Sequence, residues 1–590
     1  MAHRAASVSS WPGEHGQAEG VVVLTAELPG AVEISEEAPQ RRSRSWPAPL
    51  AAVLGGAVLL GWRASEYGSW IVDDAGITFA YARSAAEGFG PVLQPGAEPV
   101  EGFSNPTWLF VLMVGKWCGL FDRGAIFGIP DYAFYPKAVA LICCMGILAA
   151  CYAAARRVSR WPASATLATG AVLAAIPSFV IWCFSGLENA LFALTVCVLA
   201  VHLFLAVLDD RLWTPAVAVT AGALAAFAAS TRPDGLIYLA AYPLISVVLV
   251  RRATWPAALR CGLYSGLAFA IPFGTYLLWR IVEFGRFVPN TAVAKHQSLP
   301  SVYDLTRVGE LVRYVGVPAV PAAVVVGGLA LWPPSKWRSG AVALLVPLVL
   351  AVVAYCVLEP DWMAQFRFAT PVWALGAVVL VLSVGQLAAR LRKHGRALVA
   401  LGLIGAAIPS GCAFAEQSAA YSADEDVPVC WIALRFGRLF NGYADILRIQ
   451  NGTLLTPDMG GSALTSRLQL IDMAGLTHTR MADIIAGNDR TTFGDYVFEE
   501  LRPTFIHTHG PWLENNITSD ARVMRDYYVL QRSEDPTVPD EDWVRKDVVH
   551  GQHQLGQLRD YAATAIPPLV EKQQTVGCGP TLHPGETLVG

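Results

Sequence analysis

Charged residues are scarce in this chain of 590 residues, where they make up only 15% of the sequence. Soluble domains carry about a quarter charged residues, so this scarcity argues against a soluble protein. The 54% of hydrophobic residues and the mean hydropathy of +0.43 point to a membrane instead. A basic excess is also lacking, because the net charge is −4. No basic surface for binding nucleic acid is therefore expected. The hydrophobic composition instead predicts a protein embedded in the lipid bilayer.

The 11 cysteines lack the spacing of a metal site. Most stand singly in apolar runs, and the adjacent pair Cys143 and Cys144 cannot form a CxxC motif. We interpret these residues as buried thiols in helices. Cys430 and Cys578 differ because they lie in a hydrophilic tail, where a disulfide can form if the tail is outside the cell.

Residues 1–45 are polar and without periodicity, which is typical of a disordered segment, here a cytoplasmic leader. The segment ends in Arg41, Arg42 and Arg44, directly before an apolar run that begins at Trp46. This run lies too far from the N-terminus for a signal peptide and has no small-residue cleavage site after it. We predict a first membrane helix with a positively charged cytoplasmic flank.

Ten further apolar runs have roughly the length that a bilayer requires: 136–155, 163–182, 187–207, 213–230, 236–250, 257–280, 314–332, 340–357, 366–387 and 397–414. Four clusters of basic residues follow or separate these runs, at 156–160, 251–260, 336–338 and 390–396. All four lie on the same side of the membrane as Arg41 if the stretch 105–121 is an interfacial helix and not a span. The sequence therefore predicts a multi-pass α-helical protein of the plasma membrane with about eleven spans and a cytoplasmic N-terminus.

The composition divides the chain after the last apolar run. Residues 46–414 are expected to form the transmembrane domain, with a long first outer loop at 64–135. Residues 415–590 hold most of the Asp and Glu outside the leader and contain short strand-like and helix-like pieces, for example 436–449, 468–473 and 504–507. We predict a C-terminal mixed α/β domain on the extracytoplasmic face.

Two adjacent carboxylates, Asp73 and Asp74, directly follow the first expected helix. Carboxylates at an apolar boundary are costly and tend to be functional, and a base that deprotonates an acceptor hydroxyl needs such a place. Asp73 is the first candidate for this base, because partial desolvation at the helix end would raise its basicity. Capping of a helix at 75–86 is an alternative role for Asp74 alone.

Four other polar motifs lie at expected outer helix ends, and they contain Glu188, Arg232 with Asp234, Arg286 with Asn290, Lys295 and His296, and Asp361 with Trp362 and Arg367. A cluster of their cations would suit a phosphate at headgroup depth, because Arg gives bidentate contacts. A single cation such as Arg367 is equally compatible with snorkelling toward the interface.

Histidines in the tail are a further candidate site. His507 and His509 alternate along an expected strand and therefore face the same way, as two metal ligands would. Since no further ligand is evident in range, structural roles are favoured for them, and likewise for His550 and His553. The glycosylation signals at Asn451 and Asn516 are weak.

Taken in order, these motifs resemble the actinobacterial terminal arabinofuranosyltransferases of cell-wall arabinan, within the GT-C class of polyprenyl-phosphate-sugar-dependent enzymes. The resemblance covers about residues 46–530, and its motifs are 73–75, 81–83, 88–90, 99–106, 185–188, 232–235, 288–295, 361–363, 367–368 and 471–477. The chain departs from the family pattern at Gly76, Ala80, Asn189 and Glu359-Pro360, whereas the first-loop Asp pair is kept.

The resemblance implies an inverting glycosyl transfer at the outer membrane face, from a polyprenyl-phosphate sugar, with arabinofuranose favoured, to a cell-envelope polysaccharide or glycolipid. Asp73 and Asp74 would be catalytic, Asp73 as the general base. Binding of the donor phosphate and substrate would involve Tyr81, Glu188, Arg232, Asp234, Asn290, Lys295, His296, Asp361, Trp362 and Arg367. A divalent cation, Ca²⁺ or Mg²⁺, is compatible with oxygen ligands from Asp73, Asp74 and Asp361, but a phosphate leaving group does not require one.

A transporter or flippase and a scaffold or receptor are the two alternatives to a glycosyltransferase. A transporter or flippase of a lipid-linked sugar would place ionisable residues near the bilayer midplane. Here the polar motifs lie at helix ends on one side, and the expected spans hold no Asp or Glu apart from Glu188, the second residue of the run 187–207. A scaffold or receptor would not explain the long first loop with its paired carboxylates. The glycosyltransferase is therefore the favoured interpretation.

Overall fold

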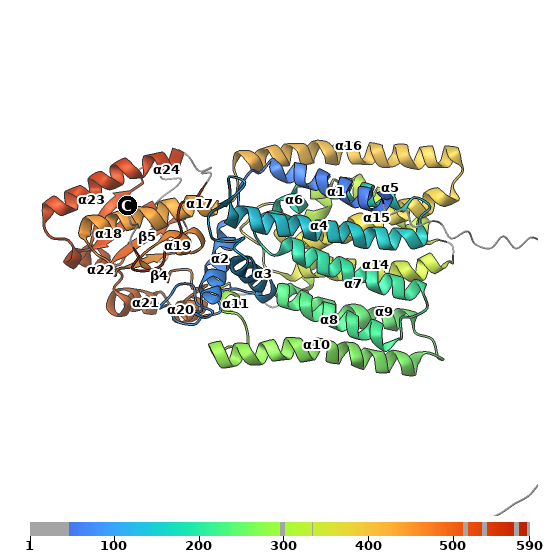
Figure 1. Cartoon of the computed structure of the whole chain (residues 1–590), viewed down its shortest axis with the longest axis horizontal. Helices are drawn as coiled ribbons and strands as arrows, with labels where there is room; N and C mark the ends of the chain where they lie inside the picture. The colour runs from blue at the N-terminus through green and yellow to red at the C-terminus, as the bar shows by residue number, and fades with distance from the viewer. Residues whose placement is uncertain are drawn as a thin grey trace, which may run out of the picture. The chain divides into compact units, whose positions relative to one another are not determined.

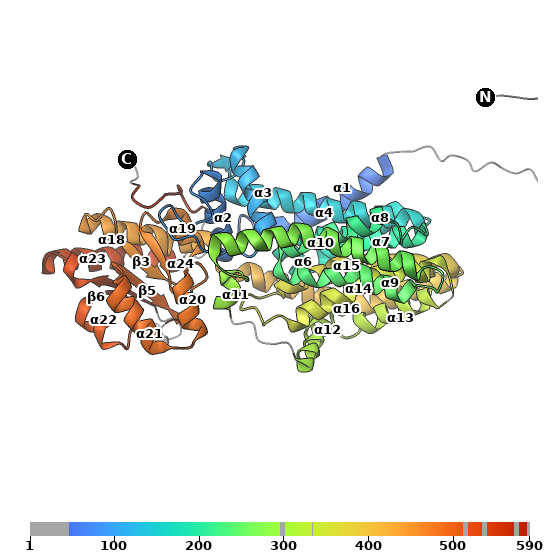
Figure 2. The same cartoon turned by 90° about the horizontal axis from the view of Figure 1, so that it is seen from below.

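The computed structural model describes residues 47–295, 301–332, 334–510, 512, 517–533, 540–571 and 577–586. The expected leader and the candidate residue His296 lie outside this part. Long apolar helices run alongside one another in both views (Figures 1 and 2). These helices, together with the short ones that connect them, are α1 Pro47–Ser65, α4 Asp131–Val158, α5 Pro162–Ala175, α6 Pro177–Cys183, α7 Asn189–Leu208, α8 Pro215–Thr231, η1 Pro233–Ala240, α9 Ala241–Leu249, α10 Trp255–Phe284, η2 Val302–Arg307, α12 Val308–Val315, α13 Ala319–Leu331, α14 Lys336–Val357, η3 Arg367–Ala369, α15 Thr370–Arg390 and α16 Lys393–Ala423.

Each of the eleven apolar runs expected from the sequence is helical, but the runs differ in length. Within the described residues, seven helices are long and apolar enough to cross a membrane, and nine spans result if each of two bent pairs counts as one. These pairs are α5–α6, bent by 86°, and η2/α12–α13, bent by 102°. The two remaining runs, 213–230 and 236–250, form α8 and the η1–α9 segment, which are shorter than the candidate spans. Proline explains the breaks at α6 and η1, since Pro177 and Pro233 stand in their first turns.

Small residues let the helices approach closely. A Cβ added to Gly170 of α5 would lie 2.7 Å from the Cα of Gly56 in α1. On the opposite side of the bundle, a Cβ on Gly222 of α8 would lie within 2.9 Å of the carbonyl carbon of Ser265 in α10. Contacts of this kind are typical of membrane helices, where close backbone packing replaces a hydrophobic driving force.

The basic clusters meet at one end of the bundle. Arg157, in the last turn of α4, forms an ion pair with Asp209, directly after α7. Lys336, at the start of α14, pairs with the neighbouring Asp210 at 2.9 Å. Arg390, at the end of α15, donates a hydrogen bond to the carbonyl oxygen of Ala330 in α13 at 2.8 Å. These contacts bring together, at one end, three of the four basic clusters that the positive-inside rule had assigned to a common side: 156–160, 336–338 and 390–396.

The first loop forms a layer of short elements at the other end of the bundle (Figure 1). They are α2 Asp73–Ala86, α3 Pro106–Trp117, and the antiparallel strands β1 Ala125–Ile126 and β2 Ile129–Pro130. The short helix α11 Asn290–Ala294 joins this layer from the loop after α10. With 12 residues, α3 is not among the candidate spans, which agrees with the interfacial helix expected there.

The chain leaves the last long helix at Ala423, beyond the expected end at residue 414. The following sheet has the strand order β4-β3-β5-β7-β6, with β3 parallel to β4 and β5, and β7 antiparallel to β5 and β6. The strands are β3 Thr453–Thr456, β4 Gln469–Asp472, β5 Phe505–His509, β6 Tyr527–Arg532 and β7 Asp540–Arg545.

Helices pack around this sheet, so the mixed α/β character expected for the tail is confirmed. They are α17 Val429–Ile432, η4 Ala433–Arg438, α18 Leu439–Leu447, α19 Gly460–Thr465, α20 Thr479–Ala486, α21 Arg490–Asp495, η5 Tyr496–Leu501, α22 Ala521–Asp526, η7 Lys546–Val548, α23 Gln552–Ala565 and α24 Pro567–Glu571. One hydrophobic core extends from the bundle into α17–α19 and α23, and a second core lies around β4, η5 and β7. Cys430 and Cys578 form a disulfide within this region, which the sequence had left open.

Candidate active site

Asp73 connects the first loop to the C-terminal region. Its side chain is buried, and its two carboxylate oxygens accept hydrogen bonds from the backbone N–H groups of Gly460 and Gly461, at 3.2 Å and 2.7 Å. Burial, with the nearby carboxylate of Asp458, raises the pKa of Asp73 well above its usual range. Asp73 thus holds the start of α19 against the start of α2.

This contact depends on glycine at the crossing of α2 and α19. A Cβ on Gly76 would lie 2.7 Å from the carbonyl carbon of Gly460. A Cβ on Gly460 would overlap the carbonyl oxygen of Asp73, at 1.9 Å. Any larger residue at either position would therefore separate the two helices. Glycine at positions 76 and 460 has this structural reason.

Asp74 faces a different group. Its Oδ2 lies 3.7 Å from Nη1 of Arg367, whose Nε lies 2.7 Å from Oδ2 of Asp361. The side chain of Asp74 is 23% exposed, against 8% for Arg367 and 10% for Asp361. The N-cap of α2 is Val72, without a side-chain cap. Asp74 therefore does not cap this helix, and it is the more accessible of the two first-loop carboxylates.

A second ion-pair group lies beside the first. Arg232 donates to Glu188 and to Asp234, each at 2.9 Å, and Asn105 donates to the other oxygen of Glu188 at 2.7 Å. The guanidinium carbons of Arg232 and Arg367 both lie 5.0 Å from the ring centre of Phe368. Phe368 thus joins the two groups into one cluster. Its two arginines are balanced by four carboxylates, so neither arginine is the uncompensated cation that the sequence suggested.

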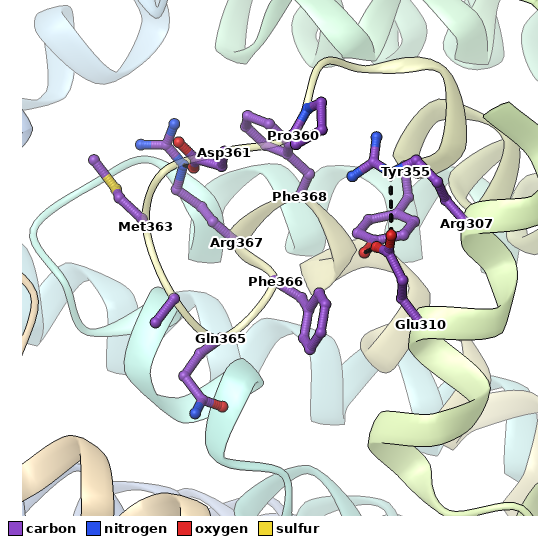
Figure 3. A pocket seen from close by; sticks show the side chains of 11 residues that line it. Arg307, Glu310, Tyr355, Pro360, Asp361, Met363, Gln365, Phe366, Arg367 and Phe368 are labelled. Atoms are coloured by element: carbon purple, nitrogen blue, oxygen red, sulfur yellow. Dashed lines mark hydrogen bonds and ion pairs between the residues drawn. The ribbon is translucent and has the colours of Figure 1, made fainter. Parts of the chain in front are cut away.

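A pocket of about 220 Å³ opens beside Arg367 (Figure 3). One wall is the segment from Pro360 to Phe368, and the other comes from η2, α12 and α14 with Arg307, Glu310 and Tyr355. Arg307 lies 5.0 Å above the ring centre of Tyr355, whose hydroxyl donates to Glu310 at 2.5 Å. The pocket therefore combines two arginines, each paired with a carboxylate of the lining (Arg307 with Glu310, Arg367 with Asp361), with aromatic and apolar walls.

The pocket wall contains strained backbone. The consecutive residues Gln365 and Phe366 both have positive φ, at 59° and 53°. Such conformations are uncommon outside glycine and tend to mark functional sites. The indole N–H of Trp182 donates to the carbonyl oxygens of Ala364 and Gln365, at 3.2 Å and 3.0 Å. Trp182 thereby holds the turn that carries Arg367 into the pocket.

Other candidate residues lie elsewhere. The Tyr81 hydroxyl donates to the carbonyl of Val100 and accepts from the N–H of Gly102, at 2.7 Å and 3.2 Å. Asn290 donates to the carbonyl oxygens of Gly475 and Leu476, at 2.7 Å and 3.1 Å. Tyr81 therefore stabilises the first loop, and Asn290 connects α11 to the C-terminal region. Three more candidates do not line the pocket within the described residues: Arg286, which pairs with Asp483, and the exposed residues Lys295 and Trp362.

The carboxylates suggested as cation ligands do not converge. Asp73 faces two backbone N–H groups of α19, whereas Asp74 and Asp361 face the guanidinium of Arg367. A cation already occupies the position between the last two carboxylates. These three residues are therefore a poor fit for Ca²⁺ or Mg²⁺, which prefers six or more oxygen ligands around one point.

Sequence reasoning missed three kinds of residue. Arg307 and Tyr355 carry no motif, and Tyr355 lies inside an apolar run. Asn105 belongs to the motif 99–106 but was not named as a site residue, although its amide holds Glu188. The pair Gly460-Gly461 was a usable signal, because adjacent glycines between two strands mark a close backbone approach.

No protein-family model and no curated protein matches the sequence. Solved structures do match. ArnT from Cupriavidus metallidurans, in the apo state, has a TM-score of 0.54 at 15% identity, over 86% of this chain and 100% of that one. The same protein bound to undecaprenyl phosphate has a TM-score of 0.53, with the same identity and coverage. A mycobacterial arabinofuranosyltransferase, AftD, matches with a TM-score of 0.47 and 12% identity, over 86% of this chain and 40% of that one. The chain therefore has a polytopic membrane fold of the GT-C type.

Proposed function

We propose that the protein is a membrane glycosyltransferase that uses a polyprenyl-phosphate sugar. The main support is that Asp74 lies 3.7 Å from Arg367, which lines a pocket together with Arg307. This pocket lies in a protein with a GT-C fold, at the end of the helix bundle where the first loop packs. A proton acceptor and a phosphate-binding cation are the two groups that such a transfer needs. The ArnT structure with bound undecaprenyl phosphate shows that a related fold takes a lipid phosphate.

In this proposal Asp74 is the general base. A base must reach the acceptor hydroxyl, and both oxygens of Asp73 are buried against α19. Asp74 is more exposed and is held by one long ion pair of 3.7 Å. The acceptor oxygen attacks the anomeric carbon, Asp74 takes its proton, and the bond to the lipid phosphate breaks. Attack opposite the leaving group inverts the configuration without a covalent intermediate.

Arg367 and Arg307 bind the donor phosphate in this scheme. A phosphate on Arg367 competes with Asp74 for its guanidinium and so frees the base when the donor is present. The leaving phosphate gains negative charge in the transition state, which a positioned guanidinium stabilises. The apolar wall around Phe366 and Met363 suits the first isoprene units of the carrier.

The sugar, the acceptor and the membrane orientation belong to the same proposal. The motif order favours arabinofuranose and a cell-envelope polysaccharide or glycolipid, as in terminal arabinofuranosyltransferases. The shared end of the basic clusters supports a cytoplasmic location for that end and an outer location for the pocket and the tail. The Cys430–Cys578 disulfide supports an oxidising, outer compartment for the tail.

The transporter or flippase is not favoured. Its mechanism needs ionisable groups near the middle of the spans. The clustered carboxylates and arginines described above instead lie at helix ends and loops: Asp74 starts α2, Arg232 follows α8 and Asp361 follows α14. A site at the ends of the membrane helices suits a reaction on a lipid headgroup better than transport through the bilayer.

The deciding experiment offers purified protein a panel of polyprenyl-phosphate sugars with cell-envelope glycans as acceptors. Wild type should release lipid phosphate with one donor, and the stereochemistry of the product should be inverted. Asp74→Asn should retain the donor and lose turnover. Release of lipid phosphate by neither form, together with protein-dependent movement of the lipid-linked sugar across liposomes, would contradict the proposal and favour the flippase.

A further inference from the structure

Three side chains from distant parts of the tail converge at one edge of its sheet. Asp458, His507 and His509 each place one possible ligand atom so that all three atoms lie within 4.8 Å of one another. The strand pattern explains this convergence. β3 and β5 are parallel, with Leu455 opposite Ile506, so Asp458, two residues beyond the end of β3, comes close to His509 at the end of β5. The alternate residues of β5 face one side of the sheet, as the sequence predicted.

His507 is oriented like a metal ligand. Its Nδ1 lies 2.8 Å from the carboxylate of Asp542 on β7, directly opposite in the strand register. A carboxylate on one ring nitrogen fixes the tautomer and leaves the other nitrogen as a free acceptor, the usual arrangement around metal-binding histidines. The Nε2 of His507 is fully buried and has no hydrogen-bond partner among the described residues. A buried acceptor without a partner requires an explanation.

The supporting residues make this orientation rigid. Arg435 and the hydroxyl of Tyr443 each donate to Asp542 at 3.1 Å. The ring of Phe436 lies 4.0 Å from that of His507 and 5.9 Å from that of His509, measured between ring centres. Both imidazole planes are thus set by packing before any ligand binds. Preorganised ligands with a hydrogen-bonded outer shell are what a metal site requires.

The remaining two ligands are reachable from solvent. Nε2 of His509 lies 2.7 Å from Oδ2 of Asp458, and their side chains are 32% and 19% exposed. An ion that entered here would take the place of the proton shared by these two atoms and would release it. The third ligand, Nε2 of His507, lies behind them in the interior. The site therefore has an open entrance and a closed back.

We propose that Asp458, His507 and His509 bind a divalent transition-metal ion of the Zn²⁺ class. Two imidazoles and one carboxylate suit Zn²⁺, Cu²⁺, Fe²⁺ or Ni²⁺ and not Ca²⁺ or Mg²⁺, which prefer all-oxygen sites. Three protein ligands leave a fourth position for water or a substrate oxygen. The sequence found the two histidines but missed Asp458, which supplies the third ligand.

The ion would also act on the first loop. Asp458 lies two residues before Gly460, whose N–H group binds Asp73. Metal binding at Asp458 fixes this turn and thereby the start of α2. The ion is a positioning element in this role, because it reaches α2 only through Asp458 and the N–H groups of Gly460 and Gly461, which bind Asp73.

The test uses the full chain in detergent, purified through a tag without histidine and stripped with a chelator. Titration with Co²⁺ should give one equivalent of bound ion with visible d–d absorption, and Zn²⁺ should displace it. Asp458→Asn and His509→Gln should each weaken Co²⁺ binding at least tenfold. The matched control is His553→Gln, which changes an exposed histidine of α23 and should bind Co²⁺ like wild type. No sugar donor is needed, so the result is independent of the proposed transfer.

A second measurement covers the case of a misfolded variant. Zn²⁺ should slow hydrogen exchange of the backbone amides at 458–465 in wild type but not in His509→Gln. Two outcomes would overturn the proposal: no stoichiometric uptake of Co²⁺ or Zn²⁺ by folded wild type, or equal uptake by wild type and both ligand variants. Stronger binding of Ca²⁺ or Mg²⁺ than of Zn²⁺ would also contradict the proposed class of ion.

Discussion

The carboxylate of Asp73 accepts a hydrogen bond from the backbone N–H of Gly461 at 2.7 Å, across 388 positions of sequence. The neighbouring Asp74 faces Arg367 instead, which lines the pocket. Two adjacent residues of one motif therefore have different contacts: one fastens the C-terminal region to the first loop, and the other pairs with a pocket arginine. Their substitution should separate the effects of these contacts.

Asp74→Asn should keep the fold and lower turnover. The amide has nearly the same shape as the carboxylate but cannot take a proton, and general base catalysis contributes about a hundred- to ten-thousandfold in rate. The measurement is release of lipid phosphate from the donor, with thermal stability recorded beside it. Turnover of Asp74→Asn near that of wild type would remove it as the base and return Asp73 to that role.

Asp73→Asn should act through structure. The amide nitrogen cannot accept a hydrogen bond, so one buried N–H of α19 loses its partner, at a cost of about 1–3 kcal/mol. We expect a lower melting temperature and faster hydrogen exchange at 460–465. Unchanged exchange there, with turnover lost, would contradict a fastening role.

Arg307→Gln should weaken donor binding. A charged hydrogen bond contributes about 1.5–3 kcal/mol, which corresponds to roughly a ten- to 150-fold rise in the donor Kd. Lys295→Met is the control, because Lys295 is exposed and does not line the pocket. The assay is binding of a polyprenyl phosphate to the purified protein. A larger loss with Lys295→Met than with Arg307→Gln would place the phosphate outside the pocket.

Gly76→Ala should separate α2 from α19. The added methyl group would meet the backbone of Gly460 at 2.7 Å, and backbone cannot move aside cheaply. We expect Gly76→Ala to lower the free energy of unfolding by about 1–3 kcal/mol or more, which is the typical cost of overpacking. Gly556→Ala in α23 meets nothing within 4 Å and should be neutral or stabilising, by about 0.5–1 kcal/mol. Equal melting temperatures for the two variants would contradict the close approach.

Asp472 makes the tail sensitive to pH. Burial raises the pKa of Asp472 from 3.8 to about 6, against the lowering effect of hydrogen bonds from Thr477, Ala474 and Gly475. Because this pKa is higher in the folded state, protonation favours folding. The contribution is complete below about pH 4 and is lost as pH rises through 6, by at most about 3 kcal/mol.

The measurement is the melting temperature of wild type and Asp472→Asn between pH 4 and 7. Relative to the variant, wild type should lose stability as pH rises from 4 to 6 and then level off. Asp560→Asn, at an exposed carboxyl group of α23, is the control. A gain in relative stability over the same window would show that the hydrogen bonds outweigh burial.

Cysteine labelling tests the orientation. In a background with Cys118 and Cys412 changed to Ser, Gln557→Cys places a thiol on the exposed face of α23, and His394→Cys places one beside the basic cluster at 390–396. An impermeant thiol reagent should label the first in intact cells and the second only after lysis. The reverse pattern would place the tail in the cytoplasm.

The sequence by itself determined which segments are helical in the bundle. Apolar length, proline in first turns and flanking arginines are local properties, and each of the eleven expected runs is a helix. Local patterns also found Asp74, Arg232 and Arg367, and they placed His507 and His509 on one face of a strand. Local patterns did not determine the number of full spans. Whether a helix bent at proline or a short helix crosses the membrane depends on the helices that pack beside it.

Only the tertiary structure decided what these residues contact. Hydropathy could not show that Arg232 and Arg367 are each paired with carboxylates, that Arg307 completes the pocket, or that Asp458 joins the histidines. Each of these contacts joins segments far apart in the chain, and a motif carries no information about its distant partner. Long-range packing therefore gave Asp73 and Asp74 different partners, because Gly460 and Gly461 occupy the space beside one carboxylate and the other faces Arg367.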